Sequence, residues 1–384
     1  MAVNLLVTLD DERHGVGALT HAHDAARAAG CTLRRVDGSD DRLAAWIDLH
    51  FAPSWWSYEV RAGSAWVAER DGEILGFAGF GARGLSFPWL ARWRARDGVG
   101  IFGPYGVLTR ERGRGVAPPL LTAALCALRE AGFRAALIPA VSGDALIALY
   151  RARAGAAVVE RYDYDLGRAR AVILASGAGS NARSVLDAVA AGRLPLDVAA
   201  VVVNDADAGA LQVTREAGVS ARAVVWDRAR ESRAAYDARL EAELASLAPD
   251  VVLLLGWMHL LPASFLARFA ETLNLHPAFL PLDPATDAVI APDGSVVPAL
   301  RGAHAIRDAV RLGVGWSGAT MHYVTSETDR GAVLVRVPVP VGEAVSETEL
   351  REKLRPVEQA VVAAALRRWL FERAAKTAAK TTSC

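Results

Sequence analysis

The sequence predicts an α/β protein of two domains, and three observations support this expectation. The chain has 384 residues, which is more than one hydrophobic core usually supports, so two domains of about 150 to 200 residues are expected. Residues 31–165 combine a hairpin pattern with helical stretches, which predicts a mixed α+β sheet. From residue 170 onward, short apolar strands alternate with Ala-rich helical stretches, which predicts a doubly wound, mostly parallel sheet.

The N-terminal domain begins its recognisable pattern at Cys31. SAWVAERDGEILGFAGFGA is expected to form a β-hairpin, because Asp-Gly joins two strand-like runs. Residues 1–30 are compatible with an extra strand and helix, or with a remnant of another element. The other expected elements, in order, are a strand at CTLRRV (31–36), a helix at DRLAAWIDLHFA (41–52), a strand at GVGIFGPYGVLT (98–109), a helix starting near Val116 and a closing strand pair.

The C-terminal domain follows a charged segment, YDYDLGRARA (162–171), that has no apolar run. We place the boundary near Arg168, which gives domains of residues 1–167 and 168–384. The chain should end in one amphipathic helix with a frayed polar end, residues 351–384. The expected strands are AVILAS (171–176), DVAAVVV (197–203), ARAVVW (221–226), PDVVLLLG (249–256), TLNLH (272–276), ATMHYV (319–324) and AVLVRVPV (332–339).

The composition narrows the class of protein. Lys plus Arg and Asp plus Glu number 43 each, so there is no net charge to attract nucleic acid or an anionic membrane. No apolar run reaches the roughly 18 residues of a membrane helix. Cys31, Cys126 and Cys384 match neither a disulfide framework nor a zinc pattern. Together with an N-terminus that lacks the pattern of a secretory signal, this predicts a cytoplasmic protein.

The stretch ILASGAGSNARSVLDAV (173–189) has the pattern of an anion site. An apolar strand, a Gly- and Ser-rich turn and a helix follow one another, so unpaired N–H groups at the helix start would face a bound anion. Gly177 and Gly179 permit close approach, and Ser180 and Asn181 add side-chain donors. Because the loop is not GxGxxG, a single phosphate is favoured over a dinucleotide. An ordinary glycine turn with a helix cap remains an alternative.

The stretch LNLHPAFLP (273–281) carries Asn274 and His276 on alternate positions of a strand, so both should project from the same face near its end. Ligands bind at the carboxyl ends of strands in open parallel sheets. Asp329 lies in a turn ahead of a later strand. A carboxylate, an imidazole and an amide on neighbouring loops would form an acid/base pair with an oxyanion donor. Taken singly, a buried histidine and a turn aspartate are the alternatives.

These blocks together give residues 170–371 a resemblance to the phosphoribosylglycinamide formyltransferases. The blocks SGAGSN, SRAAYDARL, APDVVLLLGWMHLL, NLHPAFLP and ETDRGAVLV occur in the same order as in that family. The resemblance implies a Rossmann-like formyltransferase fold. It also implies an enzyme that transfers the formyl group of 10-formyltetrahydrofolate to the amine of glycinamide ribonucleotide. It assigns catalysis to Asn274, His276 and Asp329. It implies no metal.

The resemblance also implies the binding residues. The substrate phosphate falls on Gly177, Ala178, Gly179, Ser180 and Asn181, and Glu358 matches a glutamate at the nucleotide end. For the folate and the surrounding site, the matching residues are Arg233, Met258, His259 and His304. His259 stands where the family usually has an arginine. After Pro281 the chain departs from the family pattern, because PLDPATDAVIAPDGSVVPALRGAHAIRDAV suggests an inserted hairpin near the pocket.

The stretch GIFGPYGVLTRERGRGVAPPLL (100–121) is similar to the acetyl-coenzyme A loop of the GCN5-related N-acetyltransferases. Arg110, Gly113 and Gly115 give RxxGxG spacing, and Arg112 and Arg114 add guanidinium groups for a pyrophosphate. Tyr150 matches a tyrosine that often protonates the departing thiolate. The resemblance covers roughly residues 31–165, and implies an acetyl-CoA-dependent N-acetyltransferase; a degenerate fold used for docking or stability is the alternative.

Several functions share the C-terminal pattern. Formyltetrahydrofolate hydrolase passes the formyl group to water, which needs neither a phosphate loop nor Glu358. Sugar-nucleotide and methionyl-tRNA formyltransferases are further relatives, and the lack of a basic patch disfavours the tRNA enzyme. A non-catalytic ligand-binding protein is the alternative of a different class. The leading expectation is a two-domain enzyme with small-molecule substrates, without nucleic-acid or membrane partners; the oligomeric state is left open.

Overall fold

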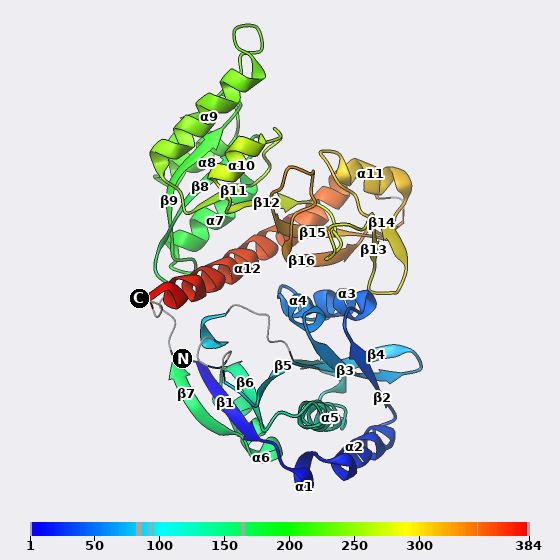
Figure 1. Cartoon of the computed structure of the whole chain (residues 1–384). Coiled ribbons are helices and arrows are strands. Elements are labelled where there is room, and N and C mark those ends of the chain that lie inside the picture. The colour runs from blue at the N-terminus through cyan, green and yellow to red at the C-terminus, as the bar shows by residue number, and fades with distance from the viewer. Residues whose placement is uncertain are drawn as a thin grey trace. The chain divides into compact units, whose positions relative to one another are not determined.

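The computed structural model describes residues 2–81, 87–90, 93, 96–162, 166–343 and 345–381 (Figure 1). The chain separates into two compact units. The first comprises Met1–Phe51, Trp56–Asp165 and Phe371–Cys384, and the second comprises Ala52–Trp55 and Leu166–Leu370. Each unit is built around its own seven-stranded sheet.

The sheet of the first unit has the strand order β2-β3-β4-β5-β6-β1-β7. Strand β1 comes first in the chain but lies inside the sheet, where it pairs antiparallel with both β6 and β7. Residues 1–30 therefore supply an interior strand and two helices. The elements are β1 (Ala2–Thr8), α1 (Asp11–His14), α2 (Val16–Ala28), β2 (Thr32–Asp37), α3 (Asp41–His50), α4 (Trp56–Arg61), β3 (Ser64–Arg70), β4 (Glu73–Phe80), η1 (Pro88–Leu90), β5 (Val99–Val107), η2 (Thr109–Glu111), α5 (Ala117–Glu130), β6 (Ala135–Val141), α6 (Asp144–Ala154) and β7 (Ala157–Tyr162).

Local sequence explains the hairpin in this sheet. Strands β3 and β4 pair antiparallel, as expected, and Asp71 and Gly72 at the turn both have positive φ, 49° and 80°. Such a turn matches the right-handed twist of the strands, and Asp-Gly is a sequence that adopts it readily. Two apolar clusters cover the sheet: α2, α5 and α6 pack on one face, and α3 and α4 on the other.

Strands β5 and β6 are parallel but separate along their length. They pair only from Val99–Ile101 with residues 135–137. Beyond Ile101, β5 keeps its pairing with β4, while β6 continues beside β1. The two strands thus part at the end of β5 that leads into the loop at residues 108–116.

The second sheet has the order β10-β9-β8-β11-β12-β15-β16. The first five strands are parallel, and β15 and β16 are antiparallel to their neighbours. The elements are β8 (Ala169–Ala175), α7 (Ser180–Ala190), β9 (Leu196–Val203), α8 (Ala210–Glu216), β10 (Ala221–Ala223), α9 (Arg233–Leu247), β11 (Val251–Leu254), α10 (Ala263–Arg268), β12 (Thr272–His276), β13 (Ala288–Ile290), β14 (Val296–Pro298), α11 (Ala305–Leu312), β15 (Trp316–Tyr323), β16 (Val333–Pro340) and α12 (Glu347–Thr381).

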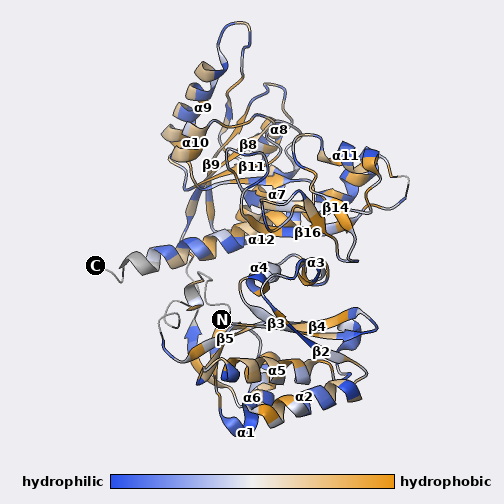
Figure 2. Ribbon diagram, turned by 45° about the vertical axis from the view of Figure 1, so that its right-hand side comes forward, coloured by the Kyte–Doolittle hydropathy of each residue, from blue (hydrophilic) through white to orange (hydrophobic). Residues whose placement is uncertain are grey.

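This sheet is buried on both faces, which confirms the expected doubly wound fold. Ala171 and Ile173 face a cluster with α7, α8 and α12, whereas Val172 and Leu174 face a cluster with α9 and α10. Burial of alternate residues on opposite faces explains why the strands are continuous apolar runs. Figure 2 shows that the strands are mostly hydrophobic, whereas α12 carries both hydrophilic and hydrophobic residues.

The expected inserted hairpin is confirmed. Strands β13 and β14 pair antiparallel, from Ala288 opposite Pro298 to Ile290 opposite Val296, and form a small separate sheet. Cys31 and Cys126 are buried and free, and Cys384 lies outside the described residues. In the described part of the chain, the helices have no apolar stretch long enough to cross a bilayer.

Candidate active site

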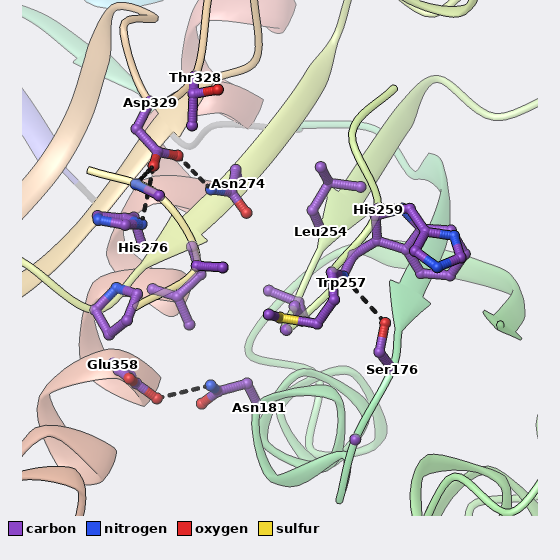
Figure 3. Close-up of a pocket in the computed structure, with 18 of the residues that line it drawn as sticks. Ser176, Asn181, Leu254, Trp257, His259, Asn274, His276, Thr328, Asp329 and Glu358 are labelled. Carbon is purple, nitrogen blue, oxygen red and sulfur yellow. Dashed lines mark hydrogen bonds and ion pairs between the residues drawn. The ribbon is translucent and has the colours of Figure 1, made fainter. Parts of the chain in front are cut away.

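A cavity of about 780 Å³ opens at the carboxyl ends of β8, β11 and β12 (Figure 3). Strand order reverses at β8: β9 lies on one side and β11 on the other. At such a switch point the loops leaving neighbouring strands diverge to opposite faces and leave a crevice for a ligand. The second sheet therefore has a cavity where the sequence pattern predicts a ligand site.

The glycine turn after β8 forms one end of this cavity, and Gly177, Ala178, Gly179, Ser180 and Asn181 all line it. Gly179 precedes helix α7 with φ +77°, a left-handed conformation that favours glycine. The carbonyl of Gly177 accepts a hydrogen bond from the N–H of Ala210 at 3.0 Å, which ties the turn to α8. The turn therefore presents the start of α7 to the cavity.

Asn274, His276 and Asp329 meet at the other end of the cavity. The Nδ2 of Asn274 donates to Asp329 Oδ1 at 3.3 Å, and His276 Nδ1 lies 3.4 Å from Asp329 Oδ2. Asn274 and His276 come from β12, while Asp329 comes from the turn between β15 and β16 (Figure 3). An amide, an imidazole and a carboxylate from two separate segments thus form one contiguous cluster.

Backbone groups fix the orientation of the imidazole and the carboxylate. His276 Nε2 lies 2.6 Å from the carbonyl oxygen of Leu300, and the N–H of Gly302 donates to Asp329 Oδ2 at 2.7 Å. Because a carbonyl oxygen only accepts, Nε2 of His276 must carry a hydrogen. Its Nδ1 is then the atom that gains or loses a proton beside Asp329.

The two titrating groups are shifted in the same direction. Burial lowers the pKa of His276 below its ordinary value, and the charge of Asp329 and the carbonyl of Leu300 oppose that effect. Burial alone would raise the pKa of Asp329, but the hydrogen bond with His322, the charge of His276 and the N–H of Gly302 outweigh it and hold that pKa well below its usual range. Asp329 is therefore a carboxylate at neutral pH.

Glu358 connects the glycine turn, residues 177–181, to helix α12. Asn181 Nδ2 donates to Glu358 Oε2 at 2.8 Å, across the floor of the cavity (Figure 3). Burial raises the pKa of Glu358, while the hydrogen bond from Asn181 and the charges of Arg351 and Arg355 oppose the shift. Arg351 and Arg355 also line the cavity and act on Glu358, so two guanidinium groups stand near the glycine turn.

The remaining predicted residues of this site are placed differently. Met258, His259 and His304 line the cavity. His259 Nδ1 lies 3.2 Å from the hydroxyl of Tyr236, and its ring contacts Trp257 edge-on. Arg233 is not among the lining residues; its side chain bonds to Asp237 and to the carbonyl of Leu260. Arg233 thus contacts Leu260, which lines the cavity, but does not line the cavity itself.

Comparisons with known proteins agree with this geometry. The family model described as Formyl transferase matches residues 169–366. Phosphoribosylglycinamide formyltransferase of Mycobacterium tuberculosis is 39% identical over 200 residues, which is 52% of this chain and 83% of the relative. The Escherichia coli protein of the same description is 35% identical over 191 residues, which is 50% of this chain and 82% of the relative.

The chain belongs to the formyl transferase family. Among solved structures, glycinamide ribonucleotide transformylase 1 from Symbiobacterium toebii aligns with 32% identity and a TM-score of 0.47, and covers 55% of this chain and 91% of that one. A second family model, that of the Acetyltransferase (GNAT) family, matches residues 32–156. The expected fusion of an acetyltransferase-like part with a formyltransferase part is confirmed.

Sequence patterns did not single out every polar residue of the formyl transferase site. His322 is buried in β15 directly opposite Asn274, and its Nε2 lies 3.2 Å from Asn274 Nδ2 and 3.4 Å from Asp329 Oδ1. Arg351 and Arg355 were also missed. The signal for His322 was a polar residue inside an apolar strand, which becomes informative only once the pairing of β12 with β15 is known.

The loop of the first unit was predicted to bind acetyl-CoA. Arg110 and Arg112 line a smaller cavity of about 260 Å³ beside His50 and Phe51. Gly113 and Gly115 both have positive φ, 77° and 85°. Arg112 and Arg114 are exposed, as a pyrophosphate site requires, whereas Arg110 pairs with Glu73.

Two features bear on the expected acetyl-CoA site: the first concerns pyrophosphate binding by the loop, and the second concerns the position of Tyr150. Pro118 and Pro119 stand in the first turn of α5, and proline has no N–H to donate, so the backbone donors end at Ala117. Tyr150 is 5% exposed, packs edge-on against Phe102, and is not among the residues that line the smaller cavity. Burial raises the pKa of its hydroxyl. The arginines and glycines fit an anionic ligand, while the tyrosine lies apart from them.

Proposed function

We propose that the C-terminal domain, residues 168–384, transfers the formyl group of 10-formyltetrahydrofolate to the amine of glycinamide ribonucleotide, a step of de novo purine (IMP) biosynthesis. The observation that carries this proposal is the arrangement within one cavity. Asn274, His276 and Asp329 form a catalytic cluster at one end, and the glycine turn with Glu358 forms an anion-binding end. The names of relatives with 39% and 35% identity support the same reaction.

The proposed chemistry follows from the donors and acceptors of the cluster. The substrate amine attacks the formyl carbon, the carbonyl π electrons move to oxygen, and a tetrahedral intermediate forms. Asn274 can donate to that oxygen, and a protonated His276 can do so from Nδ1 once substrate draws that N–H away from Asp329. Each such donor is worth about 3 to 4 kcal/mol. Collapse breaks the bond to the folate nitrogen, which receives a proton while the amine loses one.

Asp329 supplies the negative charge that the proposed reaction steps need. Its low pKa keeps it ionised, so it stabilises the imidazolium form of His276 and can accept a hydrogen bond from a water through which protons are relayed. The contacts of 3.3 and 3.4 Å in the cluster are long, as is common before substrate binds. Substrate would draw one N–H of Asn274 from Asp329 toward the formyl oxygen.

Substrate binding would use the two ends of the cavity. Backbone N–H groups from Gly177 to Asn181 would hold the phosphate, with Arg351 and Arg355 providing positive charge. The folate would lie against Met258 and His259, near His304. Met258 is 57% exposed and Leu260 71% exposed, which leaves apolar surface for a flat heterocycle to cover.

The test is production of tetrahydrofolate from 10-formyltetrahydrofolate, measured with and without glycinamide ribonucleotide. We expect turnover that depends on the nucleotide, and its loss in His276→Ala. The matched control is His21→Ala, which removes an exposed histidine of the other unit and should leave the rate unchanged. Equal rates with and without the nucleotide would instead identify a hydrolase. No turnover at all would refute both enzyme functions.

We further propose that residues 1–167 bind acetyl-CoA and transfer its acetyl group to an amine. Parted strands β5 and β6, together with the exposed Arg112 and Arg114, support this second function. Backbone groups between separating strands are free to bond an extended amide-bearing ligand. Calorimetric titration with acetyl-CoA tests it. A Kd unchanged in an Arg112→Ala, Arg114→Ala double variant would contradict the role of the loop.

A cytoplasmic location completes the proposal, with small-molecule substrates only. The two buried free cysteines support a reducing compartment.

A further inference from the structure

The insertion after Pro281 ends directly at the catalytic cluster. Its hairpin closes where the N–H of Ala299 donates to the carbonyl of Asp287 at 2.9 Å. The hairpin turn is held to β15 by Trp316 Nε1, which donates to Asp293 Oδ2 at 2.8 Å. The next three residues, 300–302, are those that contact His276 and Asp329. The insertion thus has a fixed base from which it reaches the site.

Arg301 is the hub of this junction. Its Nε donates to the backbone carbonyl of Asp329 at 3.2 Å, its Nη1 to Asp287 Oδ1 at 2.9 Å, and its Nη2 to the carbonyl of Thr286 at 2.7 Å. Only 12% of the Arg301 side chain is exposed. One planar guanidinium group therefore joins the insertion to the turn that carries the catalytic carboxylate, with a directional fork that lysine lacks.

The aspartate turn needs such support. Asp329 has φ +52°, a left-handed conformation that is uncommon for residues other than glycine. Residues 301 and 302 hold it at two points, since Arg301 bonds its backbone carbonyl and the N–H of Gly302 bonds its carboxylate. On the other side of Asp329, Arg330 donates to the carbonyl of Pro284 at 2.7 Å and also pairs with Asp287.

We propose that Arg301 is a positioning residue for catalysis. Its fork holds the turn of Asp329 so that the carboxylate faces Nδ1 of His276, whose Nε2 is held by the adjacent Leu300. The inference rests on the proposed formyl transfer for its kinetic consequence. The structural part of the inference is that Arg301 keeps the Asp329 carboxylate facing the His276 ring. This part does not depend on which substrate is used.

The test compares Arg301→Lys with Arg311→Lys. Lysine keeps the positive charge near His276 but loses the fork. Arg311 is 69% exposed and pairs only locally with Asp308, so its replacement by lysine is a matched control. We expect Arg301→Lys to lower kcat by about 10- to 100-fold, as for a catalytic group displaced by about 1 Å, with KM for both substrates nearly unchanged. Arg311→Lys should match the wild type.

A second readout does not require turnover. The titratable and charged groups that act on the His276 ring are Asp329, His322 and Arg301. Asp329 raises the pKa of His276, so a displaced Asp329 should let that pKa fall, and NMR titration of the ring should show His276 protonating at lower pH in Arg301→Lys. Asp329→Asn gives the limiting value. A titration and a kcat equal to those of the wild type would overturn the proposal.

The outcomes separate the two hypotheses. If the wild type does not formylate glycinamide ribonucleotide, the proposed function fails, and the titration alone still decides whether Arg301 positions Asp329. Should Arg301→Lys melt far below the wild type, Asp287→Ala replaces it, because the Asp287 side chain is 76% exposed, lies at the outer end of the fork and leaves Arg301 Nη1 without this acceptor. A lower pKa of His276 in that variant supports the proposal, and an unchanged one refutes it.

Discussion

Replacing Gly179 by alanine should disrupt the glycine turn, residues 177–181, through its backbone. Gly179 has φ +77°, and a left-handed conformation costs an L-residue with a Cβ about 1 to 2 kcal/mol. The added Cβ would also lie 2.7 Å from the Cα of Ala210, a distance that forces the backbone of α8 to move. We therefore expect a loss of at least about 2 kcal/mol of stability, which for a domain of this size lowers Tm by about 4 to 8 °C.

The neighbouring Gly177 provides a matched control. A Cβ there meets no atom within 4 Å, and Gly177 is not among the glycines with positive φ. Gly177→Ala should therefore keep or slightly raise Tm. If the substrate phosphate binds at this turn as proposed, the methyl group would occupy space beside it. KM for glycinamide ribonucleotide should then rise by about tenfold or more, the value of one lost hydrogen bond to a charged group.

Scanning calorimetry and steady-state kinetics on both variants separate the effects. We expect Gly179→Ala to lose stability, whereas Gly177→Ala should lose only affinity for the nucleotide. If Gly179→Ala melted within about 1 °C of the wild type, the claim that this position requires glycine would be refuted. If Gly177→Ala left KM unchanged, the phosphate would not bind at this turn.

Two further predictions concern the cluster and the folate wall. Asp329→Asn removes the charge that raises the pKa of His276, so kcat should fall at least about 100-fold. The limb of the pH–rate profile that reports His276 should also move to lower pH. A limb that stays in place or moves to higher pH would contradict the pairing of Asp329 with His276. Tyr236→Phe removes the 3.2 Å contact between the tyrosine hydroxyl and His259 Nδ1. KM for the folate, measured with the nucleotide saturating, should rise about two- to tenfold with kcat unchanged. An unchanged KM would place the folate away from His259.

Local patterns predicted the parts of the site that local chemistry determines. The glycine turn before α7 could be recognised because a strand, glycines and a helix follow one another, and Asn274 and His276 because alternation places them on one face. The Asp-Gly turn likewise identified the hairpin of β3 and β4. In each case a few consecutive residues contain the physical cause of the structure.

Features that arise from pairing between distant residues could not be predicted in this way. Strand β1 has the pattern of any short strand, and its interior position depends on pairs such as Val3 with Val141. The strand expected at residues 221–226 is confined to β10, since Trp226 turns to stack on Tyr236. Arg301 reads as a surface arginine until the insertion brings it to Asp329. These contacts are non-local, and periodicity carries no information about them.

In the proposed pair of His276 and Asp329, two opposing effects act on the pKa of the imidazole. Nε2 of His276 is committed to Leu300, so Nδ1 alone can change its protonation state. Burial opposes a proton there, whereas Asp329, at 3.4 Å, favours one. A ring buried without the carboxylate would stay neutral and could not donate to a developing oxyanion through Nδ1. Asp329 therefore favours the protonated form of His276 that the proposed reaction uses. The residues that hold the aspartate turn, Arg301 among them, would then belong to the same proposed acid/base arrangement.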